Sequence, residues 1–130
     1  MNKKEKLGWQ EATAFIASIR SRHWDARHNV YAYSVDGSAR FSDDGEPHGT
    51  AGKPMMDVIN GEGVTNLAVV VTRYFGGTLL GTGGLVRAYT EGAKAALNAA
   101  EILTYKQCVD LNITVDYSLY DKITTLCQNR

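Results

Sequence analysis

Five glycines lie within the nine residues from Gly76 to Gly84, between an apolar stretch and a stretch with helical periodicity. Such a density of glycine suits a backbone that needs positive φ or that another group must approach closely. A glycine-rich turn between a strand and a helix aims backbone N–H groups at one point, as in many phosphate sites. We therefore predict an anion or RNA-backbone site built from two flanking arginines and the loop glycines: Arg73, Arg87, Gly76, Gly77, Gly81, Gly83 and Gly84.

The same loop also has a purely structural interpretation, in which the glycines only allow tight turns and close packing of a helix on a sheet. Its spacing matches neither the phosphate loop that ends in Gly-Lys-Ser/Thr nor the dinucleotide fingerprint. Both interpretations stay open on the sequence alone.

A second polar loop, residues 41–54, carries three acids, a histidine and a lysine close together. Such a set could bind a divalent metal or transfer protons, whereas Asp-Asp-Gly and Glu-Pro are also strong turn formers. Metal ligands usually converge from separate elements, so we predict neither a metal nor catalytic residues here. Lysine and backbone donors at a helix start instead favour binding, and the candidate binding residues are Asp43, Asp44, Glu46, Thr50 and Lys53.

The composition indicates one compact domain, and its balanced charge argues against a general polyanion-binding protein. The chain has 130 residues, 44% of them hydrophobic, and 14 basic residues balance 14 acidic ones. No apolar run approaches the roughly 20 residues that cross a bilayer, and no signal-peptide segment follows the charged start. The two cysteines, Cys108 and Cys127, lie outside any metal-ligand spacing. We expect a cytoplasmic protein with reduced thiols, no membrane association and no cofactor.

Hydrophobic periodicity predicts helices and strands that alternate along the chain around one sheet. The strand at 67–72 is apolar on both faces, which predicts a central position in the sheet. The predicted helices cover residues 10–22, 54–59, 85–100 and 119–127, and the predicted strands cover 29–35, 67–72 and 109–117.

The two loops together resemble the IMPACT/YigZ family. The resemblance rests on Phe41-Ser-Asp-Asp-Gly-Glu-Pro through Met55 and on Val69-Val-Val-Thr-Arg-Tyr-Phe-Gly-Gly through Tyr89, and it covers about residues 10–105. It implies an α+β fold like domain 2 of ribosomal protein S5, a sheet with helices packed on one face. That fold is shared with a domain of translocation elongation factors and with a family of small-molecule kinases.

The resemblance also implies a domain organisation. Residues 1–105 correspond to the amino-terminal domain of the family, and residues 106–130 resemble the first strand and helix of an incomplete carboxy-terminal ferredoxin-like unit. Family members begin with a strand that contains a Lys-Ser-Arg-Phe-like segment, where this chain has Met1-Asn2-Lys3-Lys4. We expect a shortened form that pairs with itself, because a missing edge strand exposes backbone hydrogen-bonding groups.

Eukaryotic relatives are translational regulators, so the resemblance implies a translation-associated regulatory binding module. Its expected partners are RNA or ribosome-associated factors, and no catalytic residue carries over from the family. One alternative is an enzyme acting on a small phosphorylated ligand or nucleotide, with proton transfer by one of Asp43, Asp44, Glu46 or His48. Another is a protein-interaction domain whose glycines serve packing alone.

Overall fold

The computed structural model of the chain describes residues 7–129 and contains a three-stranded antiparallel sheet in the order β2-β1-β3. β1 (His28–Val35) and β2 (Ser38–Ser42) form a hairpin whose turn, Asp36-Gly37, has positive φ at both residues. β3 (Leu67–Arg73) pairs with the other side of β1. The predicted α+β class is confirmed.

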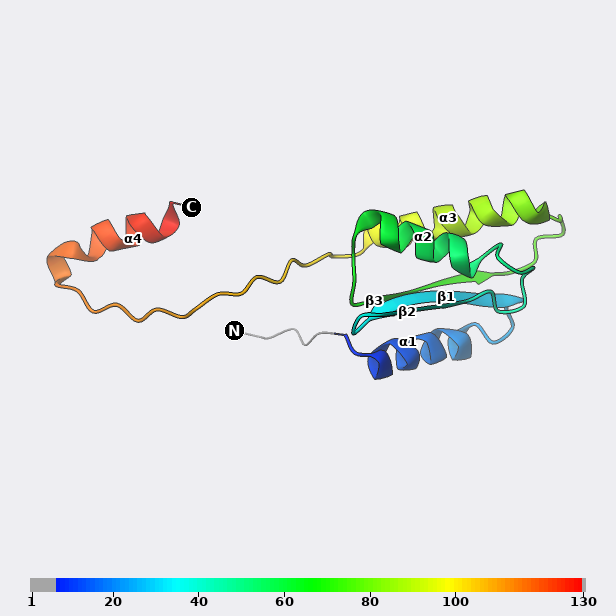
Figure 1. The fold of residues 1–130 in the computed structure, drawn as a ribbon, viewed down its shortest axis with the longest axis horizontal. Coiled ribbons are helices and arrows are strands. Elements are labelled where there is room, and N and C mark those ends of the chain that lie inside the picture. Colours follow the sequence, from blue (N-terminus) through cyan, green and yellow to red (C-terminus); the bar gives the residue numbers. More distant parts are fainter. Residues whose placement is uncertain (1–6, 130) are drawn as a thin grey trace.

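Helices cover both faces of this sheet (Figure 1). α2 (Gly52–Glu62) and α3 (Gly81–Ala99) pack on one face, and α1 (Trp9–Arg22) packs on the other. The expectation of helices on one face holds for α2 and α3 and is wrong for α1. The reason is that the strands carry apolar side chains on both faces, so each face needs a cover. The finer likeness to ribosomal protein S5 stays a prediction.

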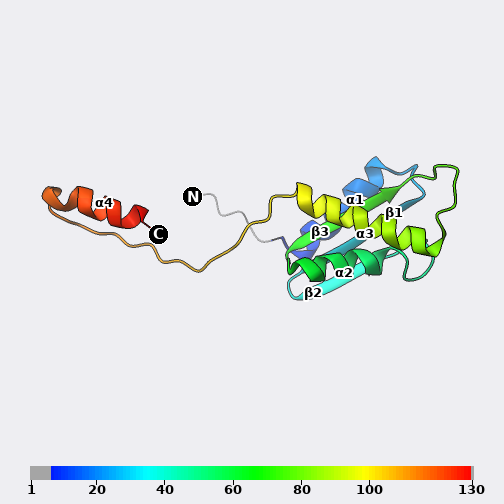
Figure 2. The same cartoon turned by 90° about the horizontal axis from the view of Figure 1, so that it is seen from above.

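The main core lies between the sheet and the pair α2 and α3, which run side by side over it (Figure 2). α3 contributes one buried stripe at helical spacing, in which Tyr89 is only 1% exposed. The buried cluster contains Val30, Ala32, Ala51, Met55, Met56, Val58, Ile59, Val69, Leu85, Tyr89, Ala93 and Leu97. A smaller contact involves Ala12 and Ile16 of α1.

The prediction that residues 67–72 form the central strand is wrong, because β1 is central and β3 lies at the edge of the described sheet. β3 is apolar on both faces because α1 covers one face and α3 covers the other. The apolar pattern of a strand indicates that both of its faces are buried, but it does not indicate whether both of its edges pair with neighbouring strands.

Several boundaries differ from the predicted ones. α3 begins at Gly81 instead of Leu85, and three of the loop glycines, Gly81, Gly83 and Gly84, lie in its first turn. α2 is longer at both ends than predicted and stops at Gly63, whose φ is 64°. β2 was not predicted, and it takes up residues from the start of the polar loop.

Beyond α3 the chain continues as an extended segment with neither helix nor strand over residues 101–116 (Figure 1). The predicted strand at 109–117 is therefore wrong. Its alternating side chains Val109, Leu111 and Ile113 are exposed, and a strand forms only where its backbone finds a pairing partner. The predicted final helix is confirmed as η1 (Tyr117–Leu119) followed by α4 (Tyr120–Gln128).

Two further points concern the ends and the helices. The start of the chain that departs from the family pattern, residues 1–4, lies outside the described residues. Among the described helices, none combines the length and the apolar character that a membrane span requires.

Candidate functional site

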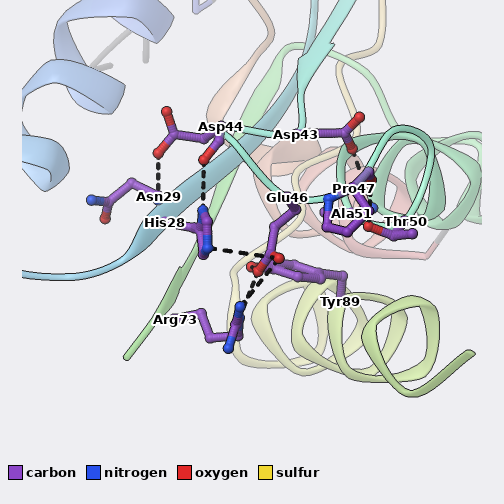
Figure 3. A network of polar contacts seen from close by, with 10 residues as sticks. All are labelled: His28, Asn29, Asp43, Asp44, Glu46, Pro47, Thr50, Ala51, Arg73 and Tyr89. Carbon is purple, nitrogen blue, oxygen red and sulfur yellow. Dashed lines mark hydrogen bonds and ion pairs between the residues drawn. The ribbon is translucent and has the colours of Figure 1, made fainter. Parts of the chain in front are cut away.

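The two loops singled out by the sequence meet at one end of the sheet, around the side chain of Glu46 (Figure 3). Glu46 lies in the loop that connects β2 to α2, Arg73 is the last residue of β3, and Tyr89 lies in α3. Three elements far apart in the sequence therefore converge on one carboxylate. Arg73 and Glu46 are thus the two predicted site residues that the fold brings into direct contact.

The Glu46 carboxylate is almost completely buried and accepts three hydrogen bonds. Arg73 donates from Nε at 2.5 Å and from Nη2 at 3.1 Å, and the Tyr89 hydroxyl donates at 2.7 Å. His28 Nε2 lies 3.7 Å from the same carboxylate. Burial by itself raises the pKa of Glu46, but the bonds from Arg73 and Tyr89 and the nearby charges outweigh it and leave that pKa lowered.

The same contacts fix the protonation of the two partners. The hydrogen bond to Glu46 raises the pKa of Arg73, so its guanidinium stays charged. Burial, followed by the bond to Glu46, raises the pKa of Tyr89 well above its ordinary value and keeps its hydroxyl a donor. This cluster is an ion pair that ties the two loops together, and its three hydrogen bonds fill most of the lone-pair positions of the Glu46 carboxylate.

Asp43 caps the start of α2. Its carboxylate accepts backbone N–H bonds from Gly49 at 3.0 Å, Ala51 at 3.2 Å and Gly52 at 2.8 Å. Burial raises its pKa, the three N–H donors and His48 lower it, and the net pKa of Asp43 is lowered. Asp43 therefore takes the place that a bound anion would occupy at this helix terminus.

Asp44 ties the acidic loop to α1 and β1. Its carboxylate accepts from Arg20 Nη2 at 2.5 Å and from the backbone N–H of Asn29 at 2.7 Å, and its carbonyl lies 2.7 Å from His28 Nδ1. Its φ of 44° is a conformation that few side chains other than Asp and Asn adopt. Asp44 is therefore engaged on three sides.

The remaining polar residues of this loop are placed separately. The hydroxyl of buried Thr50 donates to the carbonyl of Pro47 at 2.6 Å and closes a turn. Lys53 pairs with Asp57 along the exposed face of α2. His48 is fully exposed, with Nδ1 4.0 Å from Asp43. Within residues 7–129 no group of three His, Cys, Asp or Glu side chains is arranged to hold a metal ion.

The glycines of the second loop fall into three groups, one of which is Gly84 alone, where an added Cβ would lie 3.1 Å from Leu80 Cβ. Gly77 and Gly81 have φ of 88° and 72°, so the turn itself requires them. Gly76 and Gly83 have no positive φ, and a Cβ added at Gly76 would meet nothing within 4 Å. At Gly83 it would meet only the flexible Arg87 side chain, at 3.7 Å. Neither turn geometry nor close packing explains these two glycines.

Arg87 and the start of α3 form the open part of the loop. In the part of the chain that the structure describes, the first N–H groups of α3 receive no side-chain cap, and the exposed Arg87 guanidinium lies over the first turn, near Gly83. No ion pair of Arg87 occurs among the described residues. Arg87 thus differs from Arg73, whose charge is already compensated.

A cavity of about 400 Å³ lies beside this loop, between the end of β3 and α3. Its lining surface is mostly apolar, and the lining residues with polar side-chain groups are Thr72, Arg73, Tyr74, Thr78 and Tyr89. The volume falls within the range of small-molecule sites. The cavity is therefore the concave feature nearest to the open glycines.

Sequence reasoning missed several residues of the network. It singles out neither His28 nor Asn29, and it does not predict the polar contact of Tyr89. Asn29 is buried, accepts from Thr72 Oγ1 at 2.8 Å and donates to the carbonyl of His23 at 3.2 Å. A polar residue inside a β-branched strand was the one available signal.

Comparison with known proteins agrees with the motif resemblance. The family model of the Impact N-terminal domain matches residues 6–97. The chain is 42% identical over 117 residues to the IMPACT family member YvyE of Bacillus subtilis, covering 88% of this chain and 54% of that protein. It is 53% identical over 95 residues to the IMPACT family member YigZ of Escherichia coli, covering 69% of this chain and 47% of that protein.

A solved structure supports the same domain. The crystal structure of a hypothetical protein superposes with a TM-score of 0.69 at 48% identity, covering 72% of this chain and 48% of that one. The chain spans about half the length of the curated relatives described above.

Proposed function

The chain belongs to the IMPACT family, and from that premise we propose that its glycine loop binds phosphate groups of RNA as part of a translation-associated module. The observation that carries the proposal is the start of α3, where no side-chain cap is found within residues 7–129, together with Arg87 over its first turn, which has no ion pair in that same range. Free N–H groups and an adjacent guanidinium are complementary to a phosphate. The elongation-factor likeness implied by the family resemblance makes RNA the expected source of that phosphate.

The open glycines support this proposal. Gly76 and Gly83 have room in front of them and no local structural reason to be glycine. A backbone without side chains lets a phosphate oxygen approach its N–H groups directly. The acids of the neighbouring loop do not oppose an anion strongly, since Glu46 and Asp43 are each neutralised or hydrogen-bonded in place.

The proposal gives Arg73 a different task from Arg87. Arg73 holds the buried Glu46, so its removal would damage the fold as well as any binding. Arg87 is the residue whose substitution tests binding alone, because it is exposed and has no ion pair to lose among the described residues.

The test measures fluorescence anisotropy of a labelled RNA at several salt concentrations with wild type, Arg87→Ala and Lys94→Ala. Lys94 lies seven residues further along α3, about 10 Å away, and is 52% exposed, so it controls for the loss of one positive charge. We expect Arg87→Ala to weaken binding about tenfold or more. It should also reduce the salt slope by about 0.7 if the phosphate belongs to a single strand.

Equal losses in the two variants would contradict a site at the glycine loop, because they would report net charge only. Salt-independent or undetectable binding by wild type would contradict the phosphate proposal as a whole. Thermal unfolding of each variant provides the control for intact structure.

A second candidate is binding of a small phosphorylated ligand or nucleotide, and the cavity beside the loop favours it. A phosphate at the start of α3 would leave the rest of such a ligand next to this mostly apolar space. Competition by nucleotides against labelled RNA separates the two, since a small-ligand site would bind a mononucleotide at least as tightly as a longer RNA, whereas an RNA site gains affinity from further nucleotides. The engaged carboxylates Glu46 and Asp43 favour binding over a reaction.

A further inference from the structure

Exposed aromatic rings gather where the loop between α1 and β1 meets the start of the glycine loop. Trp24, Tyr74 and Phe75, here called the aromatic patch, are 82%, 49% and 46% exposed. The two segments are tied together: the Tyr74 hydroxyl donates to Asp25 at 3.1 Å and lies 2.9 Å from His23 Nδ1. Since His23 and Asp25 both contact Tyr74, the exposed Trp24 between them is held at the same place.

Positive charge accompanies these rings. The Arg27 guanidinium lies over the Phe75 ring, with Cζ 5.3 Å from the ring centroid. The chain runs from Phe75 directly into Gly76 and Gly77, so the aromatic patch borders the loop to which the phosphate site is assigned. The one acid within this group, Asp25, is engaged by the Tyr74 hydroxyl.

Flat apolar rings beside cations and backbone donors match the chemistry of unpaired nucleobases. Every base has a π-face that stacks on an aromatic ring, while the phosphates between bases need cations and N–H groups. A duplex offers its phosphates but keeps its bases stacked on one another. Two aromatic side chains of the sheet and of α3 are less available to a base, since Tyr89 is buried and Tyr31 stacks on Tyr33 within β1.

We propose that the aromatic patch stacks the bases of single-stranded RNA whose phosphates bind the adjacent glycine loop. This inference rests on the proposed phosphate site and adds the class of RNA. It assigns Trp24 and Phe75 to base contact and Arg87 to phosphate contact.

The direct test follows the fluorescence of Trp24 in a Trp9→Phe background, which removes the other tryptophan. Titration with an oligouridine of about ten nucleotides should quench Trp24, because a stacked base contacts the indole. Inorganic tripolyphosphate should compete for the loop without quenching Trp24. An unchanged Trp24 signal while the oligouridine binds would overturn the proposal.

Affinities of variants provide the second arm. Trp24→Ala and Phe75→Leu should weaken binding of the oligouridine on the order of tenfold and leave competition by tripolyphosphate unchanged. Trp9→Ala, at an exposed tryptophan on the start of α1, is the matched control and should change neither.

The outcomes separate this inference from the phosphate site. If Arg87→Ala weakens the binding of RNA and of tripolyphosphate while Trp24→Ala and Phe75→Leu change neither, the assignment of the aromatic patch to base stacking is wrong and the phosphate site stands. If wild type binds duplex RNA as tightly as the oligouridine, base stacking is likewise overturned. If Arg87→Ala changes nothing for either ligand, the phosphate site itself is wrong.

Discussion

Replacing Glu46 by glutamine tests whether the buried ion pair holds the two loops together. The substitution keeps the shape of the side chain and removes its charge, so an N–H group of the new amide or a weaker acceptor faces Arg73. Breaking one partner of a buried pair costs about 3–5 kcal/mol. Two features reduce that figure here: the Arg73 side chain is 23% exposed, and a glutamine oxygen can still accept from Tyr89. We therefore expect a loss of about 2–3 kcal/mol in the free energy of unfolding.

Urea unfolding followed by circular dichroism measures this loss, and the slope against urea should stay constant. Asp57→Asn is the matched control, since it removes the carboxylate of an exposed pair with Lys53 and should change stability by no more than about 0.5 kcal/mol. Combining Glu46→Gln with Arg73→Gln should show a coupling of about 1–3 kcal/mol. A Glu46→Gln protein as stable as the Asp57→Asn protein would refute the structural role of this pair.

Two further predictions concern acid and the glycines. Glu46 and Asp43 have lowered pKa values in the folded chain, so their contribution to stability is complete above the ordinary pKa values of 4.5 and 3.8 and is lost as pH falls through the folded values. The urea concentration at the unfolding midpoint should therefore decrease as the pH is lowered below about 5, and it should decrease less steeply in Glu46→Gln. A midpoint that does not depend on pH would contradict this. Gly52→Ala should destabilise by about 1–3 kcal/mol, because the added Cβ would lie 2.9 Å from the backbone of Ser42. The Cβ that Gly76→Ala adds would meet nothing within 4 Å, so this variant should change the free energy of unfolding by less than about 0.5 kcal/mol while weakening RNA binding. If urea unfolding showed equal destabilisation of Gly52→Ala and Gly76→Ala, both glycines would serve packing.

The sequence predicted most elements of the fold because burial repeats at the period of each element. The stripe on α3 and the apolar run of β3 were both visible for this reason. The prediction of elements from the sequence failed where an element depends on a contact with a distant part of the chain. β2 is short and exposed on most positions, so it has no burial pattern of its own and becomes a strand by pairing with β1. The segment 109–117 shows the opposite error, an alternating pattern without a partner strand among the described residues.

The candidate site was predicted in part for a similar reason. Residue types and spacing identified both loops, but they could not show which charges are already compensated. Glu46 and Arg73 lie 27 positions apart, and only the packing of β3 against the acidic loop brings them together. Arg87 looks identical to Arg73 in the sequence and differs from it by the absence of an ion pair among the described residues.

This division of charge is what the proposed anion site requires in a chain with 14 basic and 14 acidic residues. Three acids of the first loop are occupied: Asp43 by backbone N–H groups, Asp44 by Arg20 and Asn29, and Glu46 by Arg73. A carboxylate whose lone pairs are filled repels an incoming phosphate less than a free one does, because its partners carry compensating charge or dipoles. The exposed guanidinium of Arg87 has no such compensation among the described residues, so it leaves one uncompensated positive charge at the glycine loop although the formal net charge of the chain is zero. Net charge is therefore a poor guide to this surface, and the salt dependence of the Arg87→Ala variant is a better one.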